Sequence, residues 1–137
     1  MPLDRMDHFS IRTTKLEETR EFYETTLGMK VGERPPLPFP GYWLYLRDDA
    51  VIHLVGIDED NPDGLNDYLG EIDVNQLSGS GAVDHLAFRA SDALNLVNKL
   101  KIKKVPYRER VVQEMNLYQL FVEDPNNITL ELNYWDD

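Results

Sequence analysis

The spacing of hydrophobic residues predicts that one structural unit occurs twice in this chain. In residues 6–12 apolar and polar side chains alternate, which is typical of a strand with one buried face. Residues 14–28 instead place apolar side chains three and four positions apart, which predicts a helix. Alternating segments follow over 29–33, 42–47 and 50–55. The first half is therefore predicted to run strand, helix, strand, strand, strand.

The second half repeats this order. Its predicted strands cover 82–89, 105–112, 117–123 and 128–134, and its predicted helix runs from Ser91 to about Leu100. We therefore expect an α+β fold of two βαβββ modules, 4–56 and 82–135, that form a curved mixed sheet with helices on the outer face. Neither half alone has enough apolar residues for a secure core, so residues 1–137 are predicted to be a single domain. The acidic linker 57–81 is long for an unstructured loop, and we expect it to wrap the body with a helical turn.

The predicted helices have recognisable end signals. Thr14 and Glu17 form a T-x-x-E capping box, and Gly28 supplies a stop. Ser91 is the predicted cap of the second helix.

Composition and charge exclude several classes of function. The chain has 25 acidic and 14 basic residues, a net charge of -11, which is the wrong sign for binding nucleic acid. No apolar run approaches the roughly 18 residues of a membrane span. There is no cysteine, which excludes disulfides and thiolate ligands. A reducing cytoplasm is compatible with this, and we expect a cytoplasmic protein.

The histidines occupy equivalent places in the two copies. His8 and His85 open similar phrases, DHFSIRT and DHLAFRA, which lie 77 residues apart. His53 follows His8 by 45 residues, and Glu131 follows His85 by 46. Each copy thus carries two residues of a type that binds metals.

Neighbouring residues indicate which way these side chains point. Ile52 and Leu54 flank His53, and Leu130 and Leu132 flank Glu131, so both polar side chains should face away from the helices. A carboxylate in an apolar strand costs several kcal/mol unless it is paired, exposed or bound to a cation. Taken singly, each histidine would more often be a half-buried, hydrogen-bonded residue, and Glu131 an exposed partner of Lys or Arg. Their equivalent positions instead favour one divalent-metal site.

Other side chains on the same faces are candidates for binding substrate. They are Arg12, Trp43, Tyr45, Arg89, Gln119 and Phe121. The aromatic residues suit a flat or apolar molecule, and Arg12 or Arg89 would hold a carboxylate or phosphate. The alternative is that both arginines lie at strand ends in water.

Four segments carry a resemblance to a known family: DHFSIRT, FYETTLGM, VDHLAF and FVEDPNNITLEL. The chain resembles the vicinal oxygen chelate superfamily, which includes glyoxalase I, methylmalonyl-CoA epimerase, extradiol dioxygenases, and fosfomycin and bleomycin resistance proteins. The resemblance implies paired βαβββ modules that cup a metal ion. By position, His8, His85 and Glu131 correspond to the family's ligands. Glyoxalase I has Glu where His53 stands, so its mechanism with two carboxylates does not transfer directly.

The leading hypothesis is a metal-dependent lyase or isomerase of the glyoxalase type. It would chelate a small substrate through adjacent oxygens and stabilise an enolate-like intermediate, with Glu131 as the catalytic carboxylate. Three imidazoles and a carboxylate suit Zn, Ni, Co, Mn or Fe. If His53 is not a ligand, His8, His85 and Glu131 match the facial triad of Fe(II) oxygenases, and an extradiol dioxygenase is the alternative. A non-catalytic, ligand-sequestering protein is a third hypothesis. The resemblance also implies a homodimer.

Overall fold

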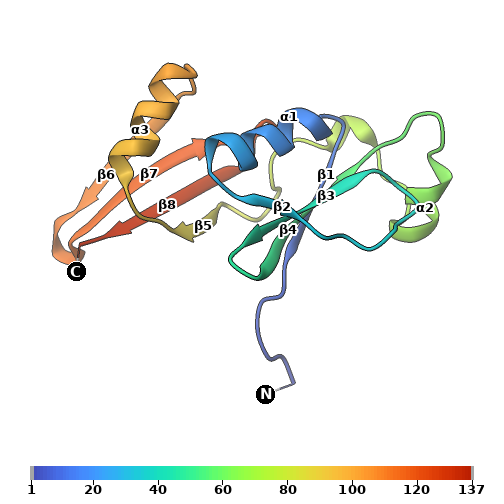
Figure 1. The fold of residues 1–137 in the computed structure, drawn as a ribbon, viewed down its shortest axis with the longest axis horizontal. Helices are drawn as coiled ribbons and strands as arrows, with labels where there is room; N and C mark the ends of the chain where they lie inside the picture. Colours follow the sequence, from blue (N-terminus) through green and yellow to red (C-terminus); the bar gives the residue numbers. More distant parts are fainter. Residues whose placement is uncertain (1, 137) are drawn as a thin grey trace. The chain divides into compact units, whose positions relative to one another are not determined.

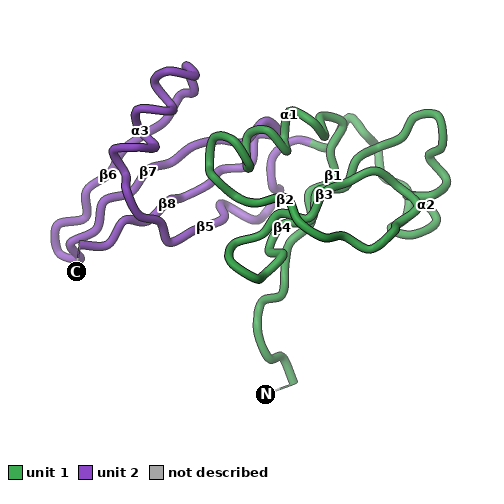
Figure 2. Tube along the Cα trace, viewed as in Figure 1, with its two compact units in different colours: residues 1–77 green, residues 78–137 purple. Residues whose placement is uncertain are grey.

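The computed structural model describes residues 2–136 and contains two compact units. The first ends at Leu77 and the second begins at Ser78 (Figure 2). Each unit holds a mixed four-stranded sheet, and the strand orders are equivalent: β1-β4-β3-β2 in the first and β5-β8-β7-β6 in the second. The predicted α+β class and the duplicated βαβββ module are confirmed.

The first unit contains the following elements (Figure 1): β1 Phe9–Thr13, α1 Leu16–Glu21, the π-helical turn η1 Phe22–Thr26, β2 Lys30–Gly32, β3 Gly41–Leu46, β4 Asp49–Gly56, α2 Asp63–Leu69 and the 3-10 turn η2 Val74–Gln76. Strand β1 pairs parallel with β4, whereas β3 pairs antiparallel with both β4 and β2. A one-residue register shift between Leu44 and Tyr45 leaves Val51 as an extra residue in β4.

The second unit contains β5 Leu86–Arg89, α3 Ala93–Ile102, β6 Tyr107–Val112, the 3-10 turn η3 Gln113–Met115, β7 Leu117–Glu123 and β8 Thr129–Trp135. Strand β5 pairs parallel with β8, and β7 pairs antiparallel with β8 and β6.

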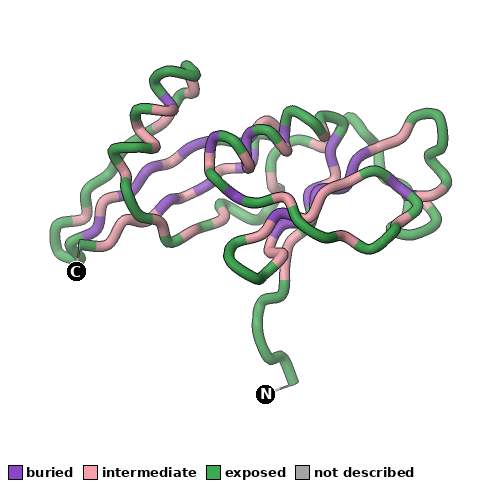
Figure 3. The backbone as a smooth tube through the Cα atoms, viewed as in Figure 1, coloured by how far each residue is buried: buried purple, intermediate pink, exposed green. Residues whose placement is uncertain are grey.

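Burial along the strands follows the predicted alternation (Figure 3). Ile52 and Leu54 are buried on either side of His53, and Leu130 and Leu132 on either side of Glu131. Because side chains alternate along a strand, His53 and Glu131 each lie on the face of their sheet opposite to the one that carries these buried neighbours, as predicted. Leu46 is an exception at 41% exposure, since it ends β3 at the hairpin turn.

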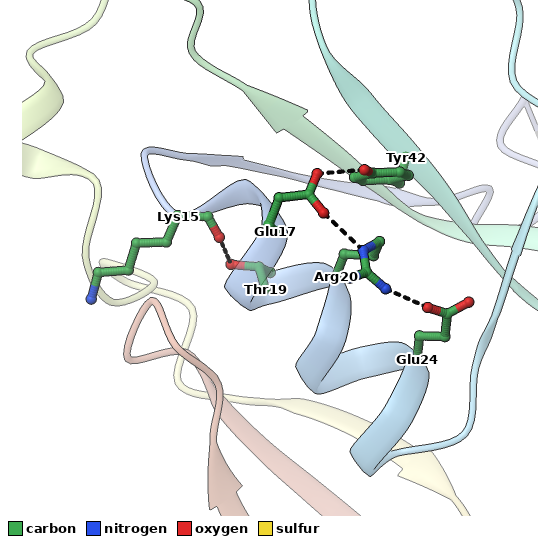
Figure 4. Close-up of polar contacts among 6 residues, drawn as sticks. All are labelled: Lys15, Glu17, Thr19, Arg20, Glu24 and Tyr42. Carbon is green, nitrogen blue, oxygen red and sulfur yellow. Dashed lines mark hydrogen bonds and ion pairs between the residues drawn. The ribbon is translucent and has the colours of Figure 1, made fainter.

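The capping box predicted for α1 is absent. The cap residue is Lys15, whose own side chain makes no capping hydrogen bond, while the Lys15 backbone N–H donates to Thr13 Oγ1 and its carbonyl accepts from the Thr19 hydroxyl. Glu17 is instead engaged by the Tyr42 hydroxyl and the Arg20 guanidinium, which ties α1 to β3 (Figure 4). The helix continues as the π-helical turn and stops at Gly28, whose φ of 84° is costly for other residues.

The cap of α3 lies one residue later than predicted. Asp92, not Ser91, accepts a hydrogen bond from the backbone of Asn95. A carboxylate caps a helix as well as a hydroxyl does, and Asp tolerates the left-handed conformation seen here.

The predicted linker contains two helical turns, α2 and η2, and most of it belongs to the first unit. Leu65 of α2 packs in a buried cluster with Phe39 and Val55. Within residues 2–136, no helix combines the length and apolar character needed to cross a bilayer.

Candidate metal and substrate site

His85 and Glu131 lie next to each other in the second unit. His85 precedes β5 by one residue, and Ala87 of β5 pairs with Glu131 of β8. Across this parallel pair the His85 Nε2 and Glu131 Oε2 atoms are 3.7 Å apart. Two ligand atoms that share a cation, each about 2.1 Å from it, lie roughly 3–3.5 Å apart. A small adjustment would therefore place both atoms on one ion.

The other nitrogen of His85 is held by its sequence neighbour. His85 Nδ1 donates to Asp84 Oδ2 at 2.7 Å, because an ionised carboxylate only accepts. The neutral ring therefore presents a free lone pair at Nε2, on the side of Glu131. The hydrogen bond to Asp84 raises the pKa of His85, and the negative charge of Glu131 adds to this effect.

His8 has the same arrangement in the first unit. Its Nδ1 donates to Asp7 Oδ2 at 2.5 Å, and this hydrogen bond lowers the pKa of Asp7. Histidines that bind metals usually donate their second N–H to such a carboxylate, which fixes the tautomer and the ring orientation. Sequence reasoning missed both aspartates, although the repeated Asp-His dipeptide was a usable signal.

His53 is clamped between two other rings. It stacks on His8 at 3.6 Å and on Trp43 at 3.9 Å, with interplanar angles of 15° and 8°. The ring Nε2 lies 3.1 Å from the Ala50 carbonyl and donates to it. In this arrangement only Nδ1 of His53 is left for a metal. Burial, followed by the positive charge of His8, lowers the pKa of His53.

A chain of hydrogen bonds crosses the sheet of the second unit and ends at Glu131. Arg110 of β6 donates to Gln119 at 2.6 Å, Gln119 of β7 donates to Asn133 at 2.8 Å, and Asn133 of β8 donates to Glu131 at 3.1 Å. The register places these side chains on one face, because Arg110 pairs with Gln119 and Gln119 with Asn133. The chain orients the Glu131 carboxylate. Arg110 and Asn133 were not singled out from the sequence, although both follow from period-two alternation.

Trp43 and Tyr45, two predicted substrate contacts, line a cleft of about 430 Å³ together with His53. The Tyr45 ring packs against Gly32, where a Cβ atom would come within 2.6 Å of it. The Tyr45 hydroxyl donates to the Glu33 carbonyl at 2.6 Å. Gly32 therefore makes room for one wall of the cleft.

The two predicted arginines have partners within their own units. Arg12 donates to the Gly70 carbonyl at 2.8 Å and so holds the segment that follows α2. The Arg89 guanidinium lies over the Trp135 ring, 5.4 Å from its centroid.

Gln119 and Phe121, the remaining predicted contacts, lie on the Glu131 face of the second unit. Gln119 is buried within the hydrogen-bonded chain. Phe121 pairs with Glu131 in the register and lines a cavity of about 440 Å³ with Arg108 and Thr129.

The candidate ligands thus occur as two pairs, His8 with His53 in one unit and His85 with Glu131 in the other. Within either described unit, no three His, Asp or Glu side chains are grouped so as to hold a metal ion. The donor set of each pair, imidazole nitrogen with imidazole or carboxylate, fits a divalent transition metal.

A family model described as Glyoxalase/Bleomycin resistance protein/Dioxygenase superfamily matches residues 5–132. The chain belongs to this superfamily. Members of the superfamily include enzymes as well as non-catalytic proteins, and they typically use divalent metals. No curated protein matches the sequence significantly.

Solved structures show the same fold. A glyoxalase family protein from Bacillus anthracis is 17% identical with a TM-score of 0.69, over 98% of this chain and 97% of that one. The fosfomycin resistance protein FosX from Listeria monocytogenes is 12% identical with a TM-score of 0.68, over 98% and 95%. The trypanothione-dependent glyoxalase I of Leishmania major is 24% identical with a TM-score of 0.63, over 95% and 86%. At these identities the likeness extends to the fold alone.

Proposed function

We propose that this protein is a metal-dependent enzyme of the glyoxalase type, acting as a lyase or isomerase on a small molecule with two adjacent oxygen atoms. The observation that carries the proposal is the pair of equivalent Asp–His contacts, Asp7–His8 and Asp84–His85. Each leaves the histidine Nε2 free. A purely structural role for these histidines would not require the same unoccupied Nε2 atom in both copies of the repeat.

His8, His85 and Glu131 would hold one divalent cation. When bound, the cation would supply Lewis-acid stabilisation of negative charge on the substrate oxygens. Zn, Ni, Co, Mn and Fe all suit imidazole and carboxylate ligands.

Glu131 is the candidate proton acceptor. Its side chain is only 13% exposed, and Asn133 fixes one of its oxygens by a hydrogen bond. A shielded, oriented carboxylate can take a proton from a carbon next to the substrate oxygens. Since the site has a single carboxylate, ligand and base would be the same residue.

The clamped ring of His53 favours a second candidate function. With Nε2 bonded to Ala50 and both ring faces covered, His53 is poorly placed to be a ligand. His8, His85 and Glu131 alone would form the facial triad of an Fe(II) extradiol dioxygenase, which binds catechols through adjacent oxygens.

One experiment separates these candidates. The purified protein is stripped with chelator, reloaded with each metal and assayed against α-hydroxycarbonyl compounds. A sample reconstituted with Fe(II) under anaerobic conditions is then assayed against catechols in the presence of O2. Isomerisation or lysis that disappears in His85→Ala but persists in Lys101→Ala supports the lyase or isomerase. Yellow ring-cleavage product with Fe(II) would instead establish the dioxygenase. Absence of metal binding and turnover in every arm would refute both and leave a sequestering protein.

A further inference from the structure

Three arginines share the Glu131 face of the second unit. Arg108 pairs with Phe121 and Arg110 with Gln119 across β6 and β7, while Arg89 pairs with Asn133 across β5 and β8. Residues directly opposite in a sheet point to the same side, so all three lie on the face that carries Glu131. Of the three, only Arg89 was predicted from the sequence to contact substrate.

Arg108 and Arg110 both lie over one aromatic ring. Their guanidinium carbons are 4.7 Å and 5.4 Å from the centroid of Phe121. Stacking on an aromatic ring orients a guanidinium and leaves its in-plane N–H donors free for other partners. Arg110 uses its Nε donor on Gln119, whereas the side chain of Arg108 makes no hydrogen bond within residues 2–136.

Within residues 2–136, none of these three arginines forms an ion pair with a carboxylate. The ion pairs found among residues 2–136 involve Arg20, His8 and His85. Two carboxylates share that face: Glu131 is engaged by Asn133 and His85, and Glu123, at the end of β7, forms no ion pair within residues 2–136. The positive charge of Arg108 and Arg110 is therefore available to a ligand.

The arrangement also indicates how far the charged end of that ligand would lie from Glu131. Arg108, Phe121 and Glu131 lie on three successive strands in register, which separates the backbones of Arg108 and Glu131 by about 10 Å. A cavity of about 440 Å³ with the size of a small-molecule pocket is lined by Arg108 and Phe121, and also by Glu123 and Asp124. Asp124 already accepts hydrogen bonds from the backbone amides of Asn126 and Ile128. Arg110 does not line the cavity but lies over the Phe121 ring, on the same sheet face as Arg108.

We propose that Arg108 and Arg110 form an oxyanion subsite for a carboxylate, phosphate or phosphonate group of the substrate. Arg108 supplies the paired N–H donors, Arg110 adds positive charge, and Phe121 supports both. The assignment of the bound anion to the substrate rests on the proposed function. The substrate would then be a small anionic molecule whose two adjacent oxygens lie some distance from its charged end. The subsite itself requires no metal.

The test uses the metal-stripped full chain, with oxalate and inorganic phosphate as probes. Binding is followed by NMR, through the arginine Nε–Hε signals and the backbone amides of β6 and β7. We expect saturable binding of at least one probe. Preference for oxalate indicates a carboxylate group, and preference for phosphate a phosphate or phosphonate.

Arg108→Gln should weaken binding about 10- to 100-fold, the loss expected for hydrogen bonds to a charged group. Arg108→Lys should give an intermediate loss, because lysine keeps the charge but not the planar fork.

The matched control is Lys101→Gln, which removes one positive charge from the exposed side of α3. It should bind both probes as the wild type does. Equal affinities of the wild type and Arg108→Gln, or no saturable binding of either probe, would overturn the subsite while leaving the metal proposal standing. Loss of metal binding in His85→Ala, with anion binding intact, would show that the two sites are separate properties.

Discussion

Asn133 donates a 3.1 Å hydrogen bond to Glu131 Oε2, the same oxygen that lies 3.7 Å from His85 Nε2. The Oε2 atom of Glu131 thus accepts a hydrogen bond from the Asn133 side-chain amide and also lies near the His85 ring. The position of the amide depends in turn on Gln119 and Arg110. Arg110, two strands away from Glu131, can therefore influence the orientation of the Glu131 carboxylate through Gln119 and Asn133.

The first prediction concerns this contact. Asn133→Ala should weaken the binding of Zn²⁺ or Co²⁺ about 10- to 100-fold, which is the usual cost of losing a partner of a metal ligand. Affinity would be measured by competition with a chromogenic chelator. Asn98→Ala, on the exposed side of α3, is the control and should bind normally. An Asn133→Ala protein with wild-type affinity would exclude a positioning role for the amide.

The second prediction concerns the two aspartates. Asp84→Ala and Asp7→Ala should each reduce metal affinity by a similar factor, because each releases a histidine from its tautomer and orientation. Asp67→Ala, exposed on α2, should not. Both Asp–His contacts would lose their proposed significance if the first two variants behaved like the third.

A third prediction follows from the opposite pKa shifts of two histidines. In metal-free protein the pKa of His53 should lie below 6.5 and that of His85 above it. NMR titration of the ring protons would measure both. Trp43→Ala should raise the pKa of His53, since burial is the main cause of its depression. Identical pKa values for the two rings would contradict the arrangement.

The same shifts fix the sign of two contributions to stability. The unfolded chain takes up the His53 proton at a higher pH than the folded protein does, so this group destabilises the fold as pH falls below about 6.5. His85 acts in the opposite sense: its protonated form stabilises the fold, and this contribution is lost as pH rises through its raised pKa.

The fourth prediction tests the wall of the first unit's cleft. Gly32→Ala places a methyl group 2.6 Å from the Tyr45 ring and should lower the free energy of unfolding by about 1–3 kcal/mol. Chemical denaturation would measure the loss. In a Tyr45→Ala background the same change should cost little, because the obstructing ring is gone. An equal cost in both backgrounds would show that the strain lies elsewhere.

Much of the fold was predictable, because the repeat indicates the order of the elements and the period-two alternation indicates which face of a strand is buried. His53 between Ile52 and Leu54, and Glu131 between Leu130 and Leu132, were placed on the correct face from their neighbours alone. The helix caps were not, since Glu17 has a tertiary partner in Tyr42 that local sequence does not reveal.

The polar contacts of the candidate site were less predictable. The Arg12 bond to Gly70 joins a strand to the unrepeated linker, and no periodicity relates the two. The stacking of His53 between His8 and Trp43 depends on the register of three strands. The shared metal site, the homodimer and the cytoplasmic location stay predictions.

The central claim is that histidines from both copies of the repeat and Glu131 bind one cation. X-ray absorption spectroscopy of the Co(II)-loaded protein tests this most directly, because it counts imidazole ligands. We predict at least two imidazoles in the wild type, one fewer in both His8→Ala and His85→Ala, and no change in His53→Ala if the facial triad is correct. A spectrum that is the same in the wild type, His8→Ala and His85→Ala would contradict the claim.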